Sequence, residues 1–177
     1  MFDDNISIGL YDKLINTVNS NLDLLHKYIE LRKEVLNLDE IHMYDLYVPL
    51  VKNYEKTWTF EEAKELILKA LSPLGETYIK DLNNLFNSNC IDVYYNNNKK
   101  SGAYSSGTYD TLPYVLLNYE GNFNDVSTIA HEMGHSMHSY YSNTNNTFED
   151  SSYPIFLAEI ASTVNEVLLN KYMYEHS

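Results

Sequence analysis

The stretch that decides the fold is residues 129–141, IAHEMGHSMHSYY. His131 and His135 are four residues apart, so on a helix they lie one above the other, about 6 Å apart along the axis. At that spacing two imidazoles can converge on one ion at the usual zinc–nitrogen distance of about 2.0–2.1 Å. The stretch therefore predicts a helix that carries two metal ligands.

Glu132 follows the first histidine and is offset from it by about 100° around the helix, too far to act as an equal third ligand. It can instead reach a water bound to the metal and take its proton, which produces a nucleophile for an amide carbonyl. Gly134 costs a helix roughly 1 kcal/mol relative to Ala, so we expect another backbone to approach closely there. The pentapeptide HEMGH also arises by chance, so the surrounding sequence must show whether it is a metal site.

A following helix, expected from Pro154 to about Met173, offers the third ligand. Its polar stripe has i, i+3, i+4 and i+7 spacing and consists of Glu159, Ser162, Thr163 and Glu166. Small residues at Ala158, Ala161 and Ser162 would let this helix pack closely and antiparallel against the histidine helix. Glu159 is the preferred third ligand and Glu166 the alternative, and the other carboxylate is expected to orient a histidine.

His138 is not expected to bind the same ion, because it lies about 10.5 Å from His131 along the helix axis. The longer motif with a third histidine needs Gly at position 138 and His at position 141. These positions hold His138 and Tyr141, which excludes that class of metalloprotease. His138 is expected to pack or to orient a ligand. The isolated histidines, expected to be structural, are His26, His42 and His176.

The rest of the chain predicts a mainly α fold with a small β-sheet before the histidine helix. Thr59 and Glu62 form a capping box at the start of one helix. Apolar periodicity and turn residues predict three helices, at 8–37, 59–71 and 76–88. Two strands are expected at 90–95 and 113–119, with a loop or hairpin between them. A further helix is expected from Asn124 or Asp125 to about Tyr141. Strand 113–119 is either purely structural or an exposed edge that pairs with an extended peptide.

Composition restricts the class of protein. The apolar fraction of 44% and charged fraction of 21% are those of a soluble globular domain. The net charge of −13 argues against nucleic acid or an anionic membrane as a partner. The single cysteine, Cys90, excludes an internal disulfide and fits a reducing compartment. With no signal peptide at the N-terminus and no apolar run of about 18 residues, the protein is expected to be cytoplasmic.

Three segments in order, residues 101–119, 129–142 and 155–170, closely resemble the oligoendopeptidase F group of the thimet oligopeptidase family of zinc metallopeptidases. Residues 25–51 are similar to that family as well. The resemblance implies one Zn²⁺ per chain held by His131, His135 and Glu159, with Glu132 as the general base. It also implies a helical metalloendopeptidase whose deep channel admits short peptides and excludes folded proteins.

Members of this family are several times longer than 177 residues, and their C-terminal helices carry a His and Tyr residues that stabilise the tetrahedral intermediate. We therefore expect residues 1–177 to be the central part of one catalytic domain, with a helical region (1–89), a small sheet (90–120) and a zinc-binding helix pair (121–177). Two other hypotheses are a catalytically incomplete, zinc-stabilised peptide-binding module and a helical structural protein with a chance HEMGH. Three tyrosine hydroxyls of this chain could take the role of those C-terminal Tyr residues, although packing roles are expected for them: Tyr104, Tyr109 and Tyr153.

Overall fold

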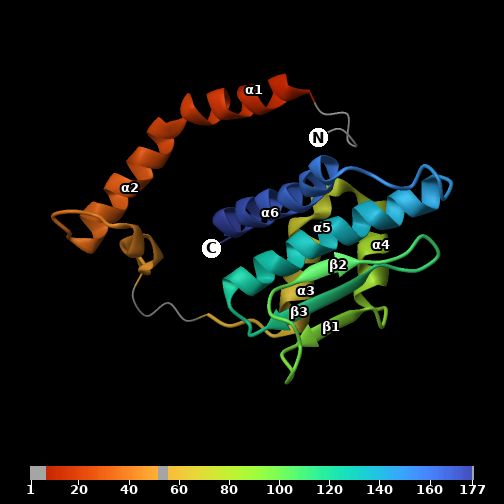
Figure 1. Ribbon diagram of the computed structural model, residues 1–177. Helices are drawn as coiled ribbons and strands as arrows, with labels where there is room; N and C mark the ends of the chain where they lie inside the picture. Colours follow the sequence, from red (N-terminus) through yellow and green to blue (C-terminus); the bar gives the residue numbers. More distant parts are fainter. Residues whose placement is uncertain (1–6, 52–55, 177) are drawn as a thin grey trace. The chain divides into compact units, whose positions relative to one another are not determined.

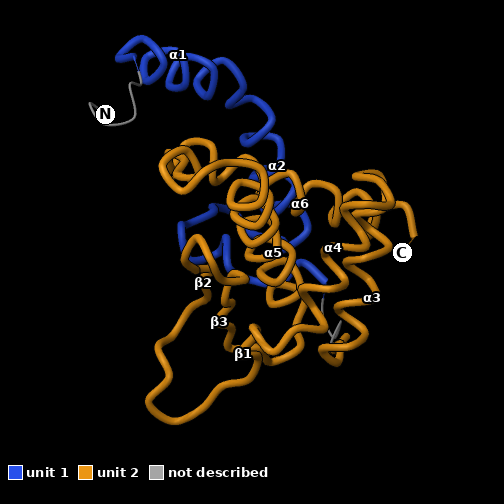
Figure 2. Tube along the Cα trace, turned by 90° about the vertical axis from the view of Figure 1, so that its right-hand side faces the viewer, with its two compact units in different colours: residues 1–54 blue, residues 55–177 orange. Residues whose placement is uncertain are grey.

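The computed structural model describes residues 7–51 and 56–176, which contain six α-helices and one three-stranded sheet (Figure 1). This confirms the prediction of a mainly α fold with a small sheet before the histidine helix. The chain divides into two compact units, residues 1–54 and 55–177 (Figure 2), and each is described by itself. The expectation that all 177 residues belong to one catalytic domain stays a prediction. The N-terminal segment predicted to lack a signal peptide lies partly outside the described residues.

The first unit contains α1 (Ile8–Asn19), α2 (Leu22–Leu36) and a 3-10 helix, η1 (Met43–Tyr47). The prediction of one helix over residues 8–37 was wrong, because the helix is interrupted at Ser20 and Asn21. The Ser20 hydroxyl and the Asn21 amide each donate to a backbone carbonyl four residues earlier, at 2.7 Å. Such side-chain bonds compete with the helical backbone and favour a break.

The second unit begins with α3 (Phe60–Ala70), a 3-10 turn η2 (Ser72–Leu74) and α4 (Glu76–Phe86). The predicted capping box is confirmed: the Glu62 N–H donates to Thr59 Oγ1 at 3.3 Å, and Glu62 Oε2 accepts from the Thr59 N–H at 2.7 Å. The helices bury apolar side chains in the core, among them Ala63, Ile67, Leu71, Leu82, Leu85 and Phe86.

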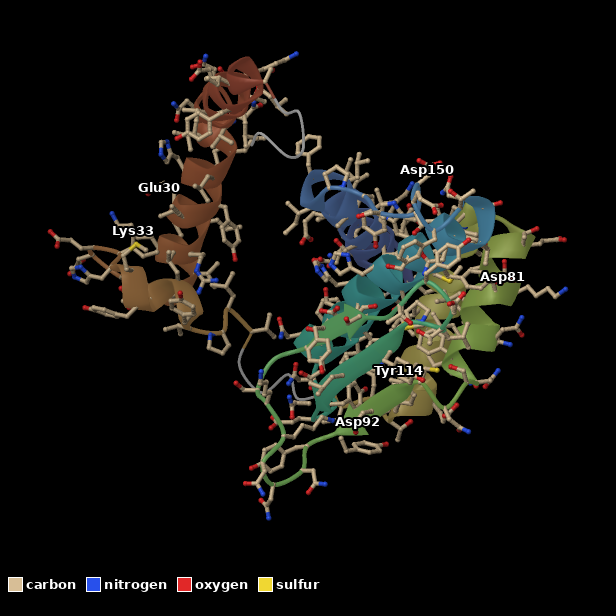
Figure 3. The ribbon with its side chains drawn as sticks, turned by 45° about the vertical axis from the view of Figure 1, so that its right-hand side comes forward. Glu30, Lys33, Asp81, Asp92, Tyr114 and Asp150 are labelled. Atoms are coloured by element: carbon tan, nitrogen blue, oxygen red, sulfur yellow. The ribbon has the colours of Figure 1, made fainter. Side chains whose placement is uncertain are left out.

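The sheet consists of β1 (Ile91–Tyr94), β2 (Tyr104–Ser106) and β3 (Tyr114–Tyr119) in the order β1-β3-β2. β1 is parallel to β3, and β2 is antiparallel to it. Val115, Leu117 and Tyr119 are buried, whereas Asp92 and Tyr114 are exposed (Figure 3).

The structure differs from the expected sheet in two ways, and for strand 113–119 it contradicts the exposed-edge alternative but not the purely structural one. β2 lies within the segment predicted to be a loop or hairpin, because a strand of three residues in a Gly- and Ser-rich stretch shows no useful alternation. β3, proposed as an exposed edge, is the central strand of the described sheet. Its backbone is therefore paired on both sides, and β1 and β2 form the two edges of the described sheet.

The two long helices of the second unit are α5 (Phe123–Asn145) and α6 (Ile155–His176). The N-cap of α5 is Asn122 rather than Asn124 or Asp125, since Asn122 Oδ1 accepts from the Asp125 N–H at 3.0 Å and Asp125 completes the capping box. α5 also runs past Tyr141 to Asn145. α6 begins directly after Pro154, whose carbonyl accepts the first helical bonds, and it extends beyond Met173.

α5 contacts both α6 and the strands β2 and β3, so it connects the sheet to the last helix (Figure 1). This arrangement brings the histidines of α5, the carboxylates of α6 and the edge strand together in one region. No helix of the described part of the chain is long and apolar enough to cross a membrane.

Candidate metal centre

Gly134 lets α5 and α6 approach at backbone distance. A Cβ at this position would lie 2.7 Å from the Ser162 Cα and 2.8 Å from the Ala161 carbonyl oxygen. Any larger residue would collide with the backbone of α6, so the predicted close approach at Gly134 is confirmed. The contacts also confirm the antiparallel pairing, because Asn165 of α6 meets Ala130 of α5, whereas the earlier Glu159 lies near the later His135.

Three side chains of the helix pair converge on one point. The Nε2 atoms of His131 and His135 lie 3.1 Å apart. Glu159 Oε2 lies 3.6 Å from His131 Nε2 and 3.7 Å from His135 Nε2. Among the residues that the structure describes, these three form the group of side chains that could hold a metal ion, with their ligand atoms within 4.8 Å of one another.

This cluster fits a tetrahedral zinc ion. Ligands at about 2.0–2.1 Å from zinc in a tetrahedron are separated from each other by roughly 3.3–3.4 Å. The separations in the cluster, 3.1, 3.6 and 3.7 Å, bracket that value. Two imidazoles and one carboxylate are also the donor set of catalytic zinc sites that keep a fourth position open.

Glu166 meets the other nitrogen of His131. Its Oε1 lies 2.5 Å from His131 Nδ1. An ionised carboxylate only accepts hydrogen bonds, so this contact favours the His131 tautomer with its proton on Nδ1, which leaves the lone pair of Nε2 for the cluster. The two carboxylates left open by the sequence thus lie at different ring nitrogens of His131: Glu159 belongs to the group that could hold a metal ion, and Glu166 contacts Nδ1.

His135 and Glu159 have supporting contacts of their own. The Ser162 hydroxyl donates to Glu159 Oε2 at 3.0 Å, and the Ala158 carbonyl is hydrogen-bonded to the His135 ring. Burial and the neighbouring His131 lower the pKa of His135, while Glu159 and the carbonyl oppose that shift. A lowered pKa keeps the imidazole neutral, which is the form that binds a metal.

Glu132 lies beside the cluster and not within it. It is 7% exposed, and it lines a cavity of about 290 Å³ together with His131 and Glu166. Burial raises the pKa of Glu132, with Glu159 adding to the rise, while His131 and the Ser105 N–H act against it. A carboxylate with a raised pKa accepts a proton more readily, as a general base requires.

The edge strand β2 contributes contacts that the sequence reasoning missed. The Ser105 hydroxyl bonds to the Ser136 hydroxyl at 2.8 Å, and its backbone N–H is hydrogen-bonded to Glu132. Ser136 is fully buried and lies one turn after Glu132 on α5. In the sequence, the signal for this contact was Ser136, one turn after Glu132. Its partner, Ser105, lies in a segment that was predicted to be a loop, so the contact could not be predicted.

The remaining candidates lie outside the metal cluster. The His138 ring stacks on Tyr153, with centroids 3.9 Å apart and the planes 11° from parallel. Burial and the neighbouring His135 lower the pKa of His138. Tyr153 also bonds to the Ser139 hydroxyl at 2.5 Å, and Tyr109 donates to the Asn146 carbonyl at 2.8 Å. These contacts agree with packing roles for His138, Tyr109 and Tyr153. Tyr104 is half-exposed on β2.

Comparison with known proteins identifies the family of this chain. The sequence profile of Peptidase family M3 matches residues 1–177. The chain belongs to peptidase family M3. The predicted resemblance to oligoendopeptidase F is thereby confirmed at the level of family and relatives.

Several M3 relatives match nearly all of this chain. It is 51% identical to Oligopeptidase PepF of Bacillus subtilis, over 93% of this chain and 24% of that protein. It is 48% identical to an Oligoendopeptidase F homolog of Borreliella burgdorferi, over 99% of this chain and 30% of that protein. The crystal structure of a putative peptidase from Chlamydophila abortus superimposes with a TM-score of 0.85 at 52% identity, covering 98% of this chain and 29% of that one. The M3 chain described here thus spans 24–30% of the length of these relatives.

Proposed function

We propose that this M3 chain carries the zinc-binding and proton-transferring residues of a zinc metalloendopeptidase that hydrolyses short peptides. The observation that supports this most directly is the cluster of His131, His135 and Glu159, with a buried carboxylate, Glu132, in the adjoining cavity. Membership of family M3, and relatives named as oligopeptidases and oligoendopeptidases, supports the substrate class.

His131 and His135 would hold one Zn²⁺ through Nε2, and Glu159 through Oε2. Bound there, zinc would lower the pKa of a coordinated water to about 7 and polarise the peptide carbonyl. Glu132 would take a proton from the attacking water onto a carboxylate oxygen and return it to the nitrogen of the leaving amine. Glu166 would keep the Nδ1 proton of His131 in place, so that Nε2 stays free to bind the metal.

The substrate would lie along β2. β3 is paired on both sides, whereas β2 is paired with β3 on one side of the described sheet. An extended peptide could add to that free edge by β-augmentation. The Ser105 N–H of β2 is hydrogen-bonded to Glu132, so a peptide at this edge would lie close to the general base.

The test is to replace Glu132→Gln in the chain, expressed with its natural flanking sequence where it has any. Cleavage of a quenched-fluorescent peptide should fall by about 10²–10⁴-fold, the usual contribution of a general base. Zinc content should remain at one ion per chain, because Glu132 is not a ligand. The control is Glu149→Gln, an exposed carboxylate in the loop before α6, which should cleave normally.

Undiminished cleavage by Glu132→Gln would remove Glu132 as the base. A wild-type protein that binds zinc and peptide but never cuts would support the non-catalytic peptide-binding module instead. A wild-type protein that loses its metal on dialysis would argue against the whole site.

A further inference from the structure

A buried amide lies at the junction of α4, α5 and α6. Asn165 is 1% exposed and sits on α6 one residue before Glu166 and six residues after Glu159. A fully buried polar side chain stabilises a fold only when its hydrogen bonds are made. Its partners therefore indicate its function.

Asn165 bonds to both neighbouring helices. Its Nδ2 donates to the Ala130 carbonyl of α5 at 3.0 Å, and Ala130 directly precedes His131. The Tyr78 hydroxyl of α4 lies 3.3 Å from both Oδ1 and Nδ2 of Asn165, so it can donate to the first or accept from the second. The Ala130 carbonyl belongs to the α5 helix, and a carbonyl oxygen has a second lone pair with which to accept the amide.

The metal cluster depends on how α6 is placed along and around α5. Sliding one helix by a single turn would displace Glu159 by about 5.4 Å, away from both histidines. The close approach at Gly134 limits the distance between the helices, but contacts between small residues are not directional. The bond from Asn165 to Ala130 is directional, and it ties α6 to α5 within one residue of His131.

We propose that Asn165 is a positioning residue that sets the register of α6 against α5, and so holds Glu159 at Nε2 and Glu166 at Nδ1 of His131. This inference rests on the proposed function, because zinc serves as the probe of the register. It assigns Asn165 no contact with metal or substrate.

The test compares Asn165→Leu with Asn170→Leu. Asn170 lies on the same helix but is exposed, and its amide bonds to the Glu166 carbonyl of its own helix at 2.9 Å. Zinc affinity is measured by competition with a chelator, and ligand geometry by the visible absorption spectrum of the Co²⁺ form. We expect Asn165→Leu to bind zinc about tenfold more weakly with an altered Co²⁺ spectrum, comparable to the loss of a residue that orients a ligand. Asn170→Leu should match the wild type in both.

The double variant Asn165→Leu/Tyr78→Phe separates positioning from stability. It removes both polar partners from the junction, so the metal-free protein should regain most of any lost stability in thermal unfolding. If the amide sets the register, zinc affinity and the Co²⁺ spectrum stay altered even in this stable protein. If the role is merely structural, both recover with stability, and the proposal is wrong.

Three further outcomes would test the register proposal or the proposed function. Wild-type zinc affinity in a well-folded Asn165→Leu protein would overturn the register proposal and leave the metal site intact. Failure of both variants to fold would assign Asn165 to folding of the helix junction and would equally overturn it. Absence of zinc from the wild type would instead contradict the proposed function.

Discussion

His131 lies between two carboxylates that contact different ring nitrogens. Glu159 is 3.6 Å from Nε2, and Glu166 is 2.5 Å from Nδ1. A ring nitrogen that carries a proton cannot bind a metal, so the two carboxylates are not interchangeable. In the proposed site, Glu159 would complete the ligand set and Glu166 would select the tautomer of His131.

Replacing each carboxylate should therefore affect zinc binding differently. Glu159→Ala should abolish stoichiometric zinc binding, since it removes one of three protein ligands. Glu166→Gln should weaken zinc by about 10–100-fold, the usual effect of losing a residue that orients a ligand. Zinc titration against a chelator measures both. A greater loss of zinc affinity in Glu166→Gln than in Glu159→Ala would indicate that Glu166 is the ligand and Glu159 the orienting residue.

At the scale of the elements, the contact between α5 and α6 depends on the missing side chain of Gly134. Gly134→Ala would improve helix propensity by about 1 kcal/mol. The added Cβ would lie 2.7 Å from the Ser162 backbone, and overpacking of this kind costs about 1–3 kcal/mol. We expect a net loss of stability and weaker zinc binding, measured by thermal unfolding and chelator competition.

Gly9→Ala is the matched control, because Gly9 also lies in a helix but, among the described residues, a Cβ there would meet only Ser7 Oγ, at 4.0 Å. Its stability should be unchanged or slightly higher. Wild-type stability and zinc affinity in Gly134→Ala would contradict the close approach.

The second contact between elements is the hydroxyl pair that joins β2 to α5. Ser136→Ala should cost about 0.5–1.5 kcal/mol of stability, the usual net value of one hydrogen bond. It should also lower kcat several-fold at unchanged zinc content, because β2 then holds Glu132 and the peptide less accurately. Unfolding, peptide cleavage and metal analysis report these effects.

Ser139→Ala is the control for this prediction, since it removes a hydroxyl–hydroxyl bond of the same helix, to Tyr153, away from β2. It should lose similar stability and keep its kcat. An equal fall in kcat in both variants would argue against a specific role for the β2 contact.

At the scale of the whole molecule, the proposed metal ligands all lie in the second unit, on α5 and α6. Zinc at 100 times its dissociation constant should stabilise the folded state by about 2.7 kcal/mol. In hydrogen exchange, zinc should increase protection in α5, α6 and β2 and leave α1 and α2 unchanged. Equal protection of both units on addition of zinc would show that the site is coupled to residues 1–54 as well.

Much of the helical part of this molecule could be predicted from the sequence. The capping box at Thr59 acts through local geometry, which depends on neighbours in the chain. Gly134 and the small residues of α6 act through a contact between helices, but their small size is visible in the sequence. The break at Ser20 and Asn21 was missed because side chains that bond to their own helix leave the apolar periodicity unchanged. The strand β2 was missed because its partner, β3, and not its own three residues, makes it a strand.

The sequence alone determined the two histidines on one helical face, the glutamate between them and a following helix with two carboxylates on one stripe, since spacing in a helix is a local property. Glu159 and Glu166 share that stripe, so spacing could not determine which one meets Nε2. The antiparallel register of α5 and α6, which we propose the Asn165 amide sets, decided it. Such contacts join residues that are distant in the chain, and their geometry exists only in the folded protein.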